Sequence, residues 1–470
     1  MSDATADRFE RHGPVCVSAS GTHLAHADGT PFFYLADTAW NGGLLSTDAE
    51  WAEYLAYRAA QGFTTIQLVA HAPWTAALAD AEGHVAFDEQ GRANPAFFDR
   101  MDRKLAAINA HGMLAVPVLA WAANFGKSRR LNMGHTAPYN FLSLMIAQMV
   151  ARFASRQVMW VLAGDGKYDW WRAWKWKSVG RTVFGPEHVI RIRKLVGKLS
   201  KGRPPSAALE SFAAGLEAAF GPNRAPVAMH PMGGTWPYKR FEKEAWLDVL
   251  GYQSSHSERP DALRWFQHGP PATYWRKRAV RARPVINLEP VYEGIAPGYA
   301  KPFGRDSVRR AVWWSLLNAP TAGVAYGAHG LWGWHDRPME ALNHTGLGEG
   351  PAWREAMKFP GAEDLARVAA FMETIEWWRL TPDDKLVEQP FPGDATGQVP
   401  AARSPEGDLA VAYVPRRPEK GVLRVDVSRL APGARAEWFD PRTGERVEAR
   451  GAEGKYEVPE GGDWVWVARS

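Results

Sequence analysis

Cysteine is almost absent from this chain: Cys16 is the single cysteine in 470 residues. One cysteine excludes an internal disulfide framework, so nothing in the sequence requires an oxidising compartment. The first twenty residues, MSDATADRFERHGPVCVSAS, contain acidic side chains and lack the apolar core of a secretory signal. We therefore expect a cytoplasmic protein.

A long hydrophobic run is also missing. The most apolar stretch, FLSLMIAQMVARF from Phe141, is shorter than the roughly 20 apolar residues that cross a bilayer, so it predicts a buried helix and no membrane partner. No excess of one charge dominates either, because 56 Lys and Arg face 51 Asp and Glu, a net charge of +5. This mild excess is spread over the chain and does not indicate a nucleic-acid partner.

Tryptophan, by contrast, is abundant, with 23 residues. A core can be filled with Leu and Val, which have no indole N–H that needs a hydrogen-bond partner. Aromatic faces can stack on the C–H faces of sugar rings, so the composition points either to carbohydrate binding or to a Trp-rich core. The composition leaves both interpretations open.

Apolar strand candidates alternate with helical segments along most of the chain. The eight candidates span 31–37, 63–70, 113–121, 158–165, 226–231, 247–256, 284–290 and 322–332. This number and the intervening helices predict an α/β protein with a (β/α)8 TIM barrel over residues 1–384, closed by a helix near 364–377. A doubly wound open sheet is the alternative, but no Gly-rich phosphate motif follows the first strand.

Local signals support the predicted elements. Thr47 and Glu50 have capping-box spacing at the start of a helix that carries Trp51, Tyr54, Leu55 and Arg58 along one face. Asn94 caps a second helix that ends near Gly112. The sequence DGT separates two short extended segments and predicts a hairpin before the first barrel strand. From about Leu386 short alternating segments and turns follow, which predict a C-terminal all-β sandwich domain over residues 385–470.

In barrels of this kind the active site lies at the carboxyl ends of the strands, so polar and aromatic residues at the strand exits are candidates. The exits carry Asp37, Trp40, His71, Trp121, Asn124, Asp165, His230, His256, Glu289, Glu293, His329 and Trp332. Asp165 and Glu289 follow the fourth and seventh strands and can face each other across a ligand. Hydrolysis of a glycosidic bond needs two such carboxyl groups, one as acid and one as nucleophile or base.

Other interpretations compete with this one. Asp165 alone could cap the next segment, and Glu289 alone could pair with an arginine. His71, His230, His256 and His329 could converge on a metal ion, but the usual ligand spacing on one strand is missing, so we expect neither a metal nor another cofactor. The segment 168–205 interleaves Trp with Lys and Arg, and we interpret it as a charged helical excursion rather than a lid for an acidic glycan.

Several motifs resemble one known family. PFFYLADTAWNGG, VMWVLAGD, NLEPVYEG and AGVAYGAHGLW resemble the apiosidase-like catalytic domain of glycoside hydrolase family 140, and the C-terminal segment is similar to the β-sandwich domain, described as collagen-binding, that commonly follows it. The resemblance implies a barrel glycosidase acting on pectin side chains. It also implies Asp165 as acid/base and Glu289 as nucleophile, with Glu293 of the same motif as a rival.

The sequence therefore yields three hypotheses. The first is a glycoside hydrolase with a carbohydrate substrate, in which Tyr292 and Tyr326 join the exit residues in lining the sugar site. The second is a non-catalytic glycan- or matrix-binding protein that uses the barrel as a scaffold. The third is a metal-dependent hydrolase built on the histidines.

Overall fold

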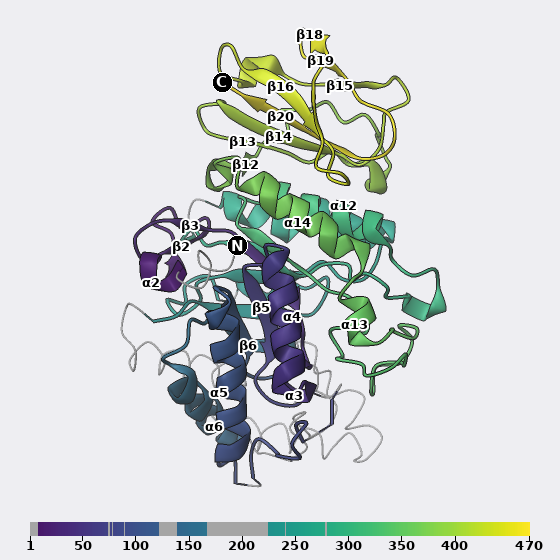
Figure 1. The fold of residues 1–470 in the computed structure, drawn as a ribbon. Helices are drawn as coiled ribbons and strands as arrows, with labels where there is room; N and C mark the ends of the chain where they lie inside the picture. The colour runs from purple at the N-terminus through teal and green to yellow at the C-terminus, as the bar shows by residue number, and fades with distance from the viewer. Residues whose placement is uncertain are drawn as a thin grey trace, which may run out of the picture.

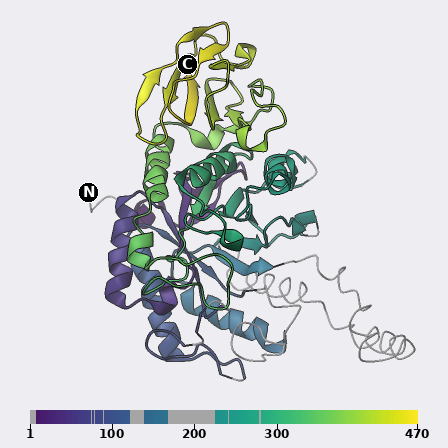
Figure 2. The same cartoon turned by 90° about the vertical axis from the view of Figure 1, so that its right-hand side faces the viewer.

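The structure is a computed structural model that describes residues 8–470 except 74, 75, 78, 89, 122–138, 167–223, 240, 278 and 279. The predicted segment 168–205 and Asn124 therefore lie outside the described residues. Figures 1 and 2 show a barrel surrounded by helices, with a β-rich C-terminal part packed against the outer helices on one side of it.

Eight parallel strands form the central sheet in the order β8-β7-β6-β5-β4-β11-β10-β9. A parallel bridge between Ala228 and Val249 joins the two outer strands and closes the barrel. The strands are β4 (Tyr34–Thr38), β5 (Thr65–Val69), β6 (Leu114–Val118), β7 (Trp160–Gly166), β8 (Val227–Pro231), β9 (Leu250–Gln253), β10 (Val285–Glu289) and β11 (Gly323–Tyr326). All eight coincide with the predicted candidates, and the (β/α)8 TIM barrel is confirmed.

Helices cover the outside of the barrel. They are α2 (Arg8–His12), α3 (Gly42–Leu45), α4 (Asp48–Ala60), α5 (Pro95–Ala110), α6 (Tyr139–Phe153), α10 (Pro260–His268), α11 (Pro270–Thr273), α12 (Arg305–Leu317), α13 (Trp353–Ala356) and α14 (Pro360–Met372). Short 3-10 helices are η2 (Pro237–Lys239), η3 (Tyr274–Arg276), η4 (Pro297–Tyr299), η5 (Trp377–Arg379), η6 (Ala395–Gly397) and η7 (Val427–Arg429). No helix within the described ranges combines the length and apolar character needed to cross a membrane.

The predicted start of α4 is confirmed atom by atom. Thr47 Oγ1 accepts a hydrogen bond from the Glu50 N–H at 3.2 Å, and Glu50 Oε2 accepts one from the Thr47 N–H at 2.9 Å. This reciprocal capping box satisfies backbone donors that have no partner within the helix. The face predicted to be buried is buried, including Trp51 and Arg58.

The predicted first strand is divided in the structure. Residues of β3 (Pro31–Phe32) pair with β2 (Leu24–His26), which pairs with β1 (Val15–Val17), whereas β4 after Phe33 joins the barrel. The DGT hairpin is therefore confirmed. Its second strand, β3, is followed directly by the first barrel strand, β4. One apolar run therefore contributes strands to two sheets. The sequence does not reveal the break at Phe33, because the run stays apolar on both sides of it.

The C-terminal part contains two antiparallel sheets. The larger contains β12 (Thr381–Pro382), β13 (Ala401–Arg403), β14 (Leu409–Val414), β16 (Arg435–Phe439), β17 (Arg446–Glu448) and β20 (Trp464–Arg469), and the smaller contains β15 (Val422–Arg424), β18 (Gly451–Ala452) and β19 (Lys455–Glu457). Buried side chains of both sheets share one apolar cluster, in which Tyr456 contacts Trp466. The first strand of the larger sheet lies just before the predicted domain boundary at residue 385.

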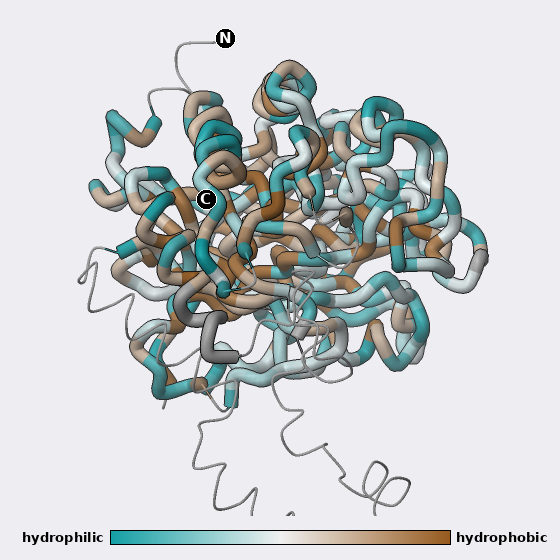
Figure 3. Tube along the Cα trace, turned by 90° about the horizontal axis from the view of Figure 1, so that it is seen from below, coloured by the Kyte–Doolittle hydropathy of each residue, from teal (hydrophilic) through white to brown (hydrophobic). Residues whose placement is uncertain are grey.

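Helices α12 and α14 lie between the barrel and the C-terminal sheets (Figure 1). The Trp313 ring of α12 stacks nearly parallel to Tyr413, with centroids 5.9 Å apart, and Phe371 of α14 packs against Phe439 at 4.8 Å. These side chains belong to the same apolar cluster as the barrel interior. The hydrophobic residues gather inside the molecule and the hydrophilic ones toward its outside (Figure 3).

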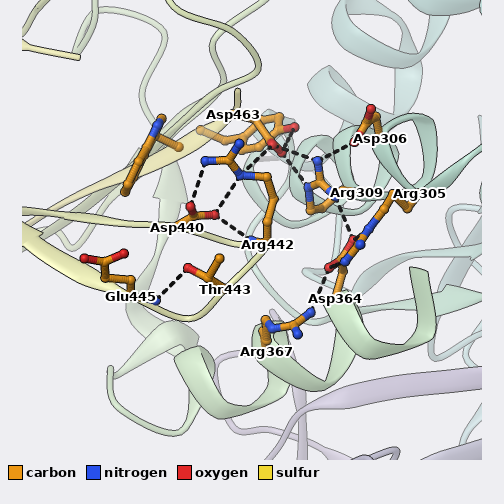
Figure 4. Close-up of polar contacts among 12 residues, drawn as sticks. Arg305, Asp306, Arg309, Asp364, Arg367, Asp440, Arg442, Thr443, Glu445 and Asp463 are labelled. Atoms are coloured by element: carbon orange, nitrogen blue, oxygen red, sulfur yellow. Dashed lines mark hydrogen bonds and ion pairs between the residues drawn. The ribbon is translucent and has the colours of Figure 1, made fainter. Parts of the chain in front are cut away.

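A buried ion-pair cluster reinforces this contact (Figure 4). Arg309 of α12 donates from Nε to Asp463 at 2.7 Å and from Nη1 to Asp364 of α14 at 2.7 Å. The guanidinium therefore joins the barrel helices to the C-terminal sheet. Tyr413 also donates its hydroxyl to Asp463, at 2.8 Å.

Candidate active site

A cavity of about 390 Å³ opens at the carboxyl ends of the barrel strands. This is the end at which barrel enzymes bind their ligands, and the volume is in the usual range for small-molecule sites. Its walls are formed by Trp40, Pro73, Trp121, Asp165, Met232, Gly233, Gln253, Ser255, His256, Glu289, Tyr292, Ile295, Trp332, His344 and Leu347. Asp165 and Glu289, the predicted pair, line the same cavity.

Glu289 is the last residue of β10. The pairing between β10 and β9 shifts by one residue after Asn287, so Glu289 lies beside Gln253. The Gln253 amide donates to Oε1 of Glu289, and the Asn287 amide lies 3.0 Å from both Ser254 Oγ and Ser315 Oγ. This bulge and its polar supports fix the carboxylate at the edge of the cavity, and only 7 % of the residue is exposed.

Two histidines flank the Glu289 carboxylate. His230 Nε2 lies 3.2 Å from Oε2, and His256 Nε2 lies 3.0 Å from Oε1. On the opposite ring nitrogens, His230 Nδ1 accepts the Asp165 N–H at 3.4 Å and His256 Nδ1 accepts the Tyr292 N–H at 3.3 Å. A nitrogen that accepts carries no proton, so each ring bears its proton on Nε2, the atom that faces Glu289, and His256 donates it to Oε1.

These donors decide the charge state of the carboxylate. Burial raises the pKa of Glu289, but the hydrogen bonds from His230 and His256 outweigh it and hold the pKa well below its usual range. Glu289 is therefore an anion at neutral pH. An anion held in place by three side-chain donors is suited to attack an electrophilic carbon or to activate water.

Asp165 also lines the cavity and lies near the end of β7. Its φ is +52°, a left-handed conformation that a non-glycine residue adopts at a cost. Ser255, another wall residue, has a φ of +79°. Strained residues of this kind concentrate at functional sites, where the surrounding structure enforces a special side-chain direction.

Gly164 makes room for the cavity wall. A Cβ at this position would lie 2.6 Å from Cε3 of Trp121, so the indole ring packs directly on the strand backbone. Trp121 is also bridged to Gly164 across the sheet and contacts Trp40, with centroids 5.3 Å apart. The glycine that precedes Asp165 is thus required by an aromatic ring of the same cavity.

Gly164→Ala is expected to displace Trp121 and to lower kcat/KM about 10–100-fold, because small displacements of positioning groups have large kinetic effects. Overpacking should cost about 1–3 kcal/mol of unfolding free energy. Steady-state kinetics and urea unfolding measure both effects. The matched control is Gly304→Ala, where an added methyl group would meet no atom within 4 Å; equal kinetics for the two variants would contradict this role of Gly164.

The other predicted site residues divide into two groups. Trp40, Trp121, His256, Tyr292 and Trp332 line the cavity, and His230 supports Glu289 from outside the lining. Asp37, His71, Glu293, Tyr326 and His329 do not line it. A position at a strand exit places a residue at the correct end of the barrel. It does not show whether the side chain points into the cavity or into the buried layer between the strands and the outer helices.

Asp37 belongs to a buried cluster beside the cavity. Its Oδ2 accepts from Arg58 Nε at 2.6 Å and from the Tyr54 hydroxyl at 2.7 Å, and Asp37 and Arg58 are completely buried. The prediction that Asp37 lines the sugar site is corrected: this carboxylate neutralises a buried arginine. A buried arginine without such a partner would be strongly destabilising.

Glu293 and Tyr326 form a second buried pair. The Tyr326 hydroxyl and the Gly361 N–H donate to Glu293 Oε2 at 2.8 and 2.9 Å. Burial nevertheless raises the pKa of Glu293 above its usual value. The rival carboxylate therefore ties the loop after β10 to the start of α14 and does not face the cavity.

His71 and His329 are held by backbone carbonyls. His71 Nε2 lies 2.8 Å from Leu119 O, and His329 Nε2 lies 2.8 Å from Gly348 O. His329 Nδ1 also accepts the indole N–H of Trp332 at 3.2 Å. His329 thus orients a cavity tryptophan without reaching the cavity itself.

The pH dependence of stability should report on His329. Burial lowers the pKa of His329 from 6.5 to about 4. Between pH 6.5 and pH 4 the imidazole is therefore mostly protonated in the unfolded chain and mostly neutral in the folded protein. Stability must then fall as the pH drops from 6.5 to 4, by roughly 2–3 kcal/mol from this group. Urea unfolding at pH 7 and pH 4.5 should show a smaller drop for His329→Gln than for the parent; identical drops would refute the assignment.

Three polar residues that line the cavity are not predicted from the sequence. Gln253 and Ser255 lie at the exit of β9, where only His256 is predicted as a site residue, although a polar residue at the last strand position is a usable signal. His344 comes from the loop after β11, far from any strand end. Its ring lies edge-on to Trp332, with centroids 6.1 Å apart, and burial lowers its pKa.

The four histidines considered as metal ligands face carbonyl oxygens or Glu289 instead. Within the described ranges, no group of three or more His, Cys, Asp or Glu side chains is arranged to hold a metal ion. His71 and His329 contact carbonyl oxygens, while His230 and His256 direct their Nε2 atoms at Glu289. The arrangement favours two carboxylates and hydrogen-bonding imidazoles as the chemical groups of the cavity.

A protein family and several solved structures are similar to this chain. The family model described as "Apiosidase-like, catalytic domain" matches residues 18–379. A glycoside hydrolase family 5 protein from Bacteroides vulgatus ATCC 8482 has a similar structure, with a TM-score of 0.76, 18% identity, and coverage of 98% of this chain and 94% of that one. A second solved glycoside hydrolase has a TM-score of 0.75 and 18% identity, with 98% of both chains covered. No curated protein matches the chain significantly.

Proposed function

We propose a two-carboxylate mechanism for this chain, which belongs to the family of apiosidase-like catalytic domains and is a glycoside hydrolase. Asp165 is the general acid/base and Glu289 the nucleophile. The observation that carries the proposal is that both carboxylates line one cavity at the carboxyl ends of the barrel strands. Retaining glycosidases use such a pair, one residue on each side of the scissile bond.

Glu289 suits the role of nucleophile. Its carboxylate is ionised and oriented by His230, His256 and Gln253, so it needs no deprotonation before it attacks the anomeric carbon. In the first step Asp165 gives its proton to the leaving oxygen while Glu289 forms a bond to the sugar. In the second step Asp165 removes a proton from the water that releases the sugar from Glu289.

The walls of the cavity suit a sugar. Trp40, Trp121 and Trp332 present aromatic rings, which can stack on the C–H faces of a pyranose or furanose ring. The Trp121 indole N–H and Gln253 Oε1 are buried and have no hydrogen-bond partner within the described residues. Hydroxyl groups of a bound sugar would supply partners for both atoms. We propose a plant-derived, pectin-like oligosaccharide or glycoside as substrate, because the family is described as apiosidase-like.

The test of the acid/base role uses leaving groups of different acidity. Asp165→Asn should lose about 10²–10⁴-fold in turnover on an alkyl glycoside, because the leaving oxygen then departs without a proton. On a dinitrophenyl glycoside, whose leaving group needs no proton, the formation of the glycosyl-enzyme should be nearly unaffected. A panel of chromogenic glycosides that includes furanosides should first identify the sugar.

Two outcomes would contradict the mechanism. Equal losses of Asp165→Asn on alkyl and dinitrophenyl substrates in pre-steady-state measurements would exclude a proton-donor role for Asp165. Proton NMR of the first product should show retention of the anomeric configuration, and inversion would exclude Glu289 as nucleophile and leave it as a base.

A further inference from the structure

A second cavity, larger than the catalytic one, lies where the barrel meets the C-terminal sheets. It has a volume of about 530 Å³, and we call it the junction cavity. The end of α10 and the end of α12 form one wall, and the connecting segment 383–401 forms the other. Its volume falls in the range of about 300–1,000 Å³ that is typical of small-molecule sites.

Two polar atoms without partners line this cavity. Asn318 at the end of α12 is only 8 % exposed, yet its Nδ2 has no hydrogen-bond partner, and Gln398 Oε1 on the opposite wall is buried and also unpaired within the described residues. A buried polar group without a partner costs about 1–3 kcal/mol, so proteins rarely keep one without a use. A ligand with both a hydrogen-bond acceptor and a hydrogen-bond donor could pair with Asn318 Nδ2 and Gln398 Oε1.

The catalytic cavity shows the same signature. There, too, a buried donor and a buried acceptor, Trp121 Nε1 and Gln253 Oε1, have no partner within the described residues. In a glycoside hydrolase the groups that complete such a cavity are sugar hydroxyls, each of which both donates and accepts. The junction cavity repeats this arrangement at a separate place in the fold.

Several other residues of the junction cavity already have hydrogen-bond partners. The Gln389 side chain binds the Val399 backbone through both its oxygen and its nitrogen, at 2.9 and 2.8 Å, and Gln267 Nε2 donates to Ala395 O at 2.6 Å. Trp314 Nε1 donates to Gln398 O at 3.0 Å. These hydrogen bonds hold the segment that carries Gln398 in place. The cavity is therefore preformed in the protein without a ligand.

The charges at the cavity do not favour a cation as occupant, because Arg264 and His268 also line it. Its three carboxylates are paired with arginines: Asp383 with Arg403 and Arg429, Asp384 with Arg276, and Asp394 with Arg416. Apolar side chains, among them Leu317, Val387 and Phe391, complete the walls. A mixture of apolar walls and unpaired hydrogen-bonding atoms without free negative charge matches a saccharide.

We propose that the junction cavity is a second, non-catalytic sugar-binding site that holds one or two units of an oligosaccharide. The site would retain a polymeric or branched substrate on the enzyme while another part of it occupies the catalytic cavity. This inference rests on the glycosidase assignment for the class of ligand, but not on the roles of Asp165 and Glu289.

Hydrogen–deuterium exchange of the full-length Glu289→Gln protein, which should not consume its ligand, tests the proposal. The probes are galactotriose, which is neutral, and trigalacturonic acid, which is acidic, each at millimolar concentration. We expect at least one probe to slow exchange in peptides covering 387–401 and 263–268, in addition to peptides of the catalytic cavity. The two probes decide whether the site prefers neutral or acidic sugars.

Gln398→Leu and Asn318→Leu, each placed in the Glu289→Gln protein, remove the unpaired acceptor and donor. Each should weaken binding at the junction at least about tenfold and abolish the protection of 387–401. Placed in the wild-type enzyme, they should leave turnover of a small chromogenic glycoside unchanged. The control Gln90→Leu makes the same chemical change at an exposed residue, and thermal unfolding shows that the variants are folded.

Unchanged exchange in 387–401 with both probes would overturn the proposal and assign the cavity to water alone. Protection that survives in folded Gln398→Leu and Asn318→Leu would overturn it as well. Failure of the catalytic assignment would be seen separately, as activity that persists in Glu289→Gln, and would leave the junction result readable.

Discussion

Glu289→Gln is expected to reduce turnover by roughly 10⁴-fold or more while the protein stays folded. The amide is neutral and cannot attack the anomeric carbon, so both steps of the reaction lose their central group. The side chain keeps its shape, and Gln253 and Ser254 still support the end of β10 and β9. Turnover on the best chromogenic glycoside and thermal unfolding measure the two properties.

Glu293→Gln is the matched control for this prediction. It makes the same chemical change four residues later in the same motif, where the carboxyl group binds Tyr326 and Gly361 rather than the cavity. We expect turnover within about tenfold of the wild type and, because a buried hydrogen-bonding pair is perturbed, a loss of about 1–3 kcal/mol in unfolding free energy. The reverse pattern, with activity lost in Glu293→Gln and kept in Glu289→Gln, would exchange the two roles.

Arg309→Leu is expected to destabilise the protein by about 3–5 kcal/mol. The guanidinium bonds Asp463 of the C-terminal sheet and Asp364 of α14. Asp364 keeps Arg305 and Arg367 as partners. Asp463, however, loses its two short charged contacts and keeps Tyr413 and, at 3.9 Å, Arg442, so a buried carboxylate is left with little counter-charge. Burial alone would lower the pKa of Arg309, but the hydrogen bonds and charges of Asp463 and Asp364 raise it above its usual value. Urea unfolding at pH 7 measures the loss.

Arg354→Leu provides the comparison for this loss. Arg354 pairs with Glu53 at 3.0 Å, but its side chain is 49% exposed, so removal of this pair should cost no more than about 1 kcal/mol. The double variant Arg309→Leu with Asp463→Asn should recover part of the Arg309→Leu loss, because one unpaired charge is then also removed. Equal effects of Arg309→Leu and Arg354→Leu would show that the buried cluster contributes nothing special.

The barrel could be predicted from the sequence because its strands are continuous apolar runs. Every residue of β5, β6 and β10 is buried, which produces segments such as VINLE that no loop would contain. Capping signals at Thr47 and Asn94 then placed the helices between them. Asp165 and Glu289, which line one cavity in the structure, could be selected as candidates because each ends such a run with an acidic side chain.

The inner wall of the cavity was harder to predict. Asp37 ends a strand in the same way as Glu289, but it lies one layer away, and only its partner reveals this. The partner was visible: Arg58 lies on the predicted buried face of α4, and a buried arginine demands a carboxylate. His344 left no such signal, because a loop residue reaches the cavity through contacts that no local pattern encodes.

Every residue of α12 from Ala311 to Leu317 is buried, because the barrel covers one side of this helix and the C-terminal sheet covers the other. The burial of α12 therefore depends on both the barrel and the C-terminal sheet. Excision of the C-terminal residues would uncover tryptophan and aliphatic surface on the remainder, so the shortened chain would precipitate rather than persist as a minimal enzyme. We therefore expect that a chain cut at the predicted boundary near residue 385 would lose the packing of α12 and α14 against the C-terminal sheet.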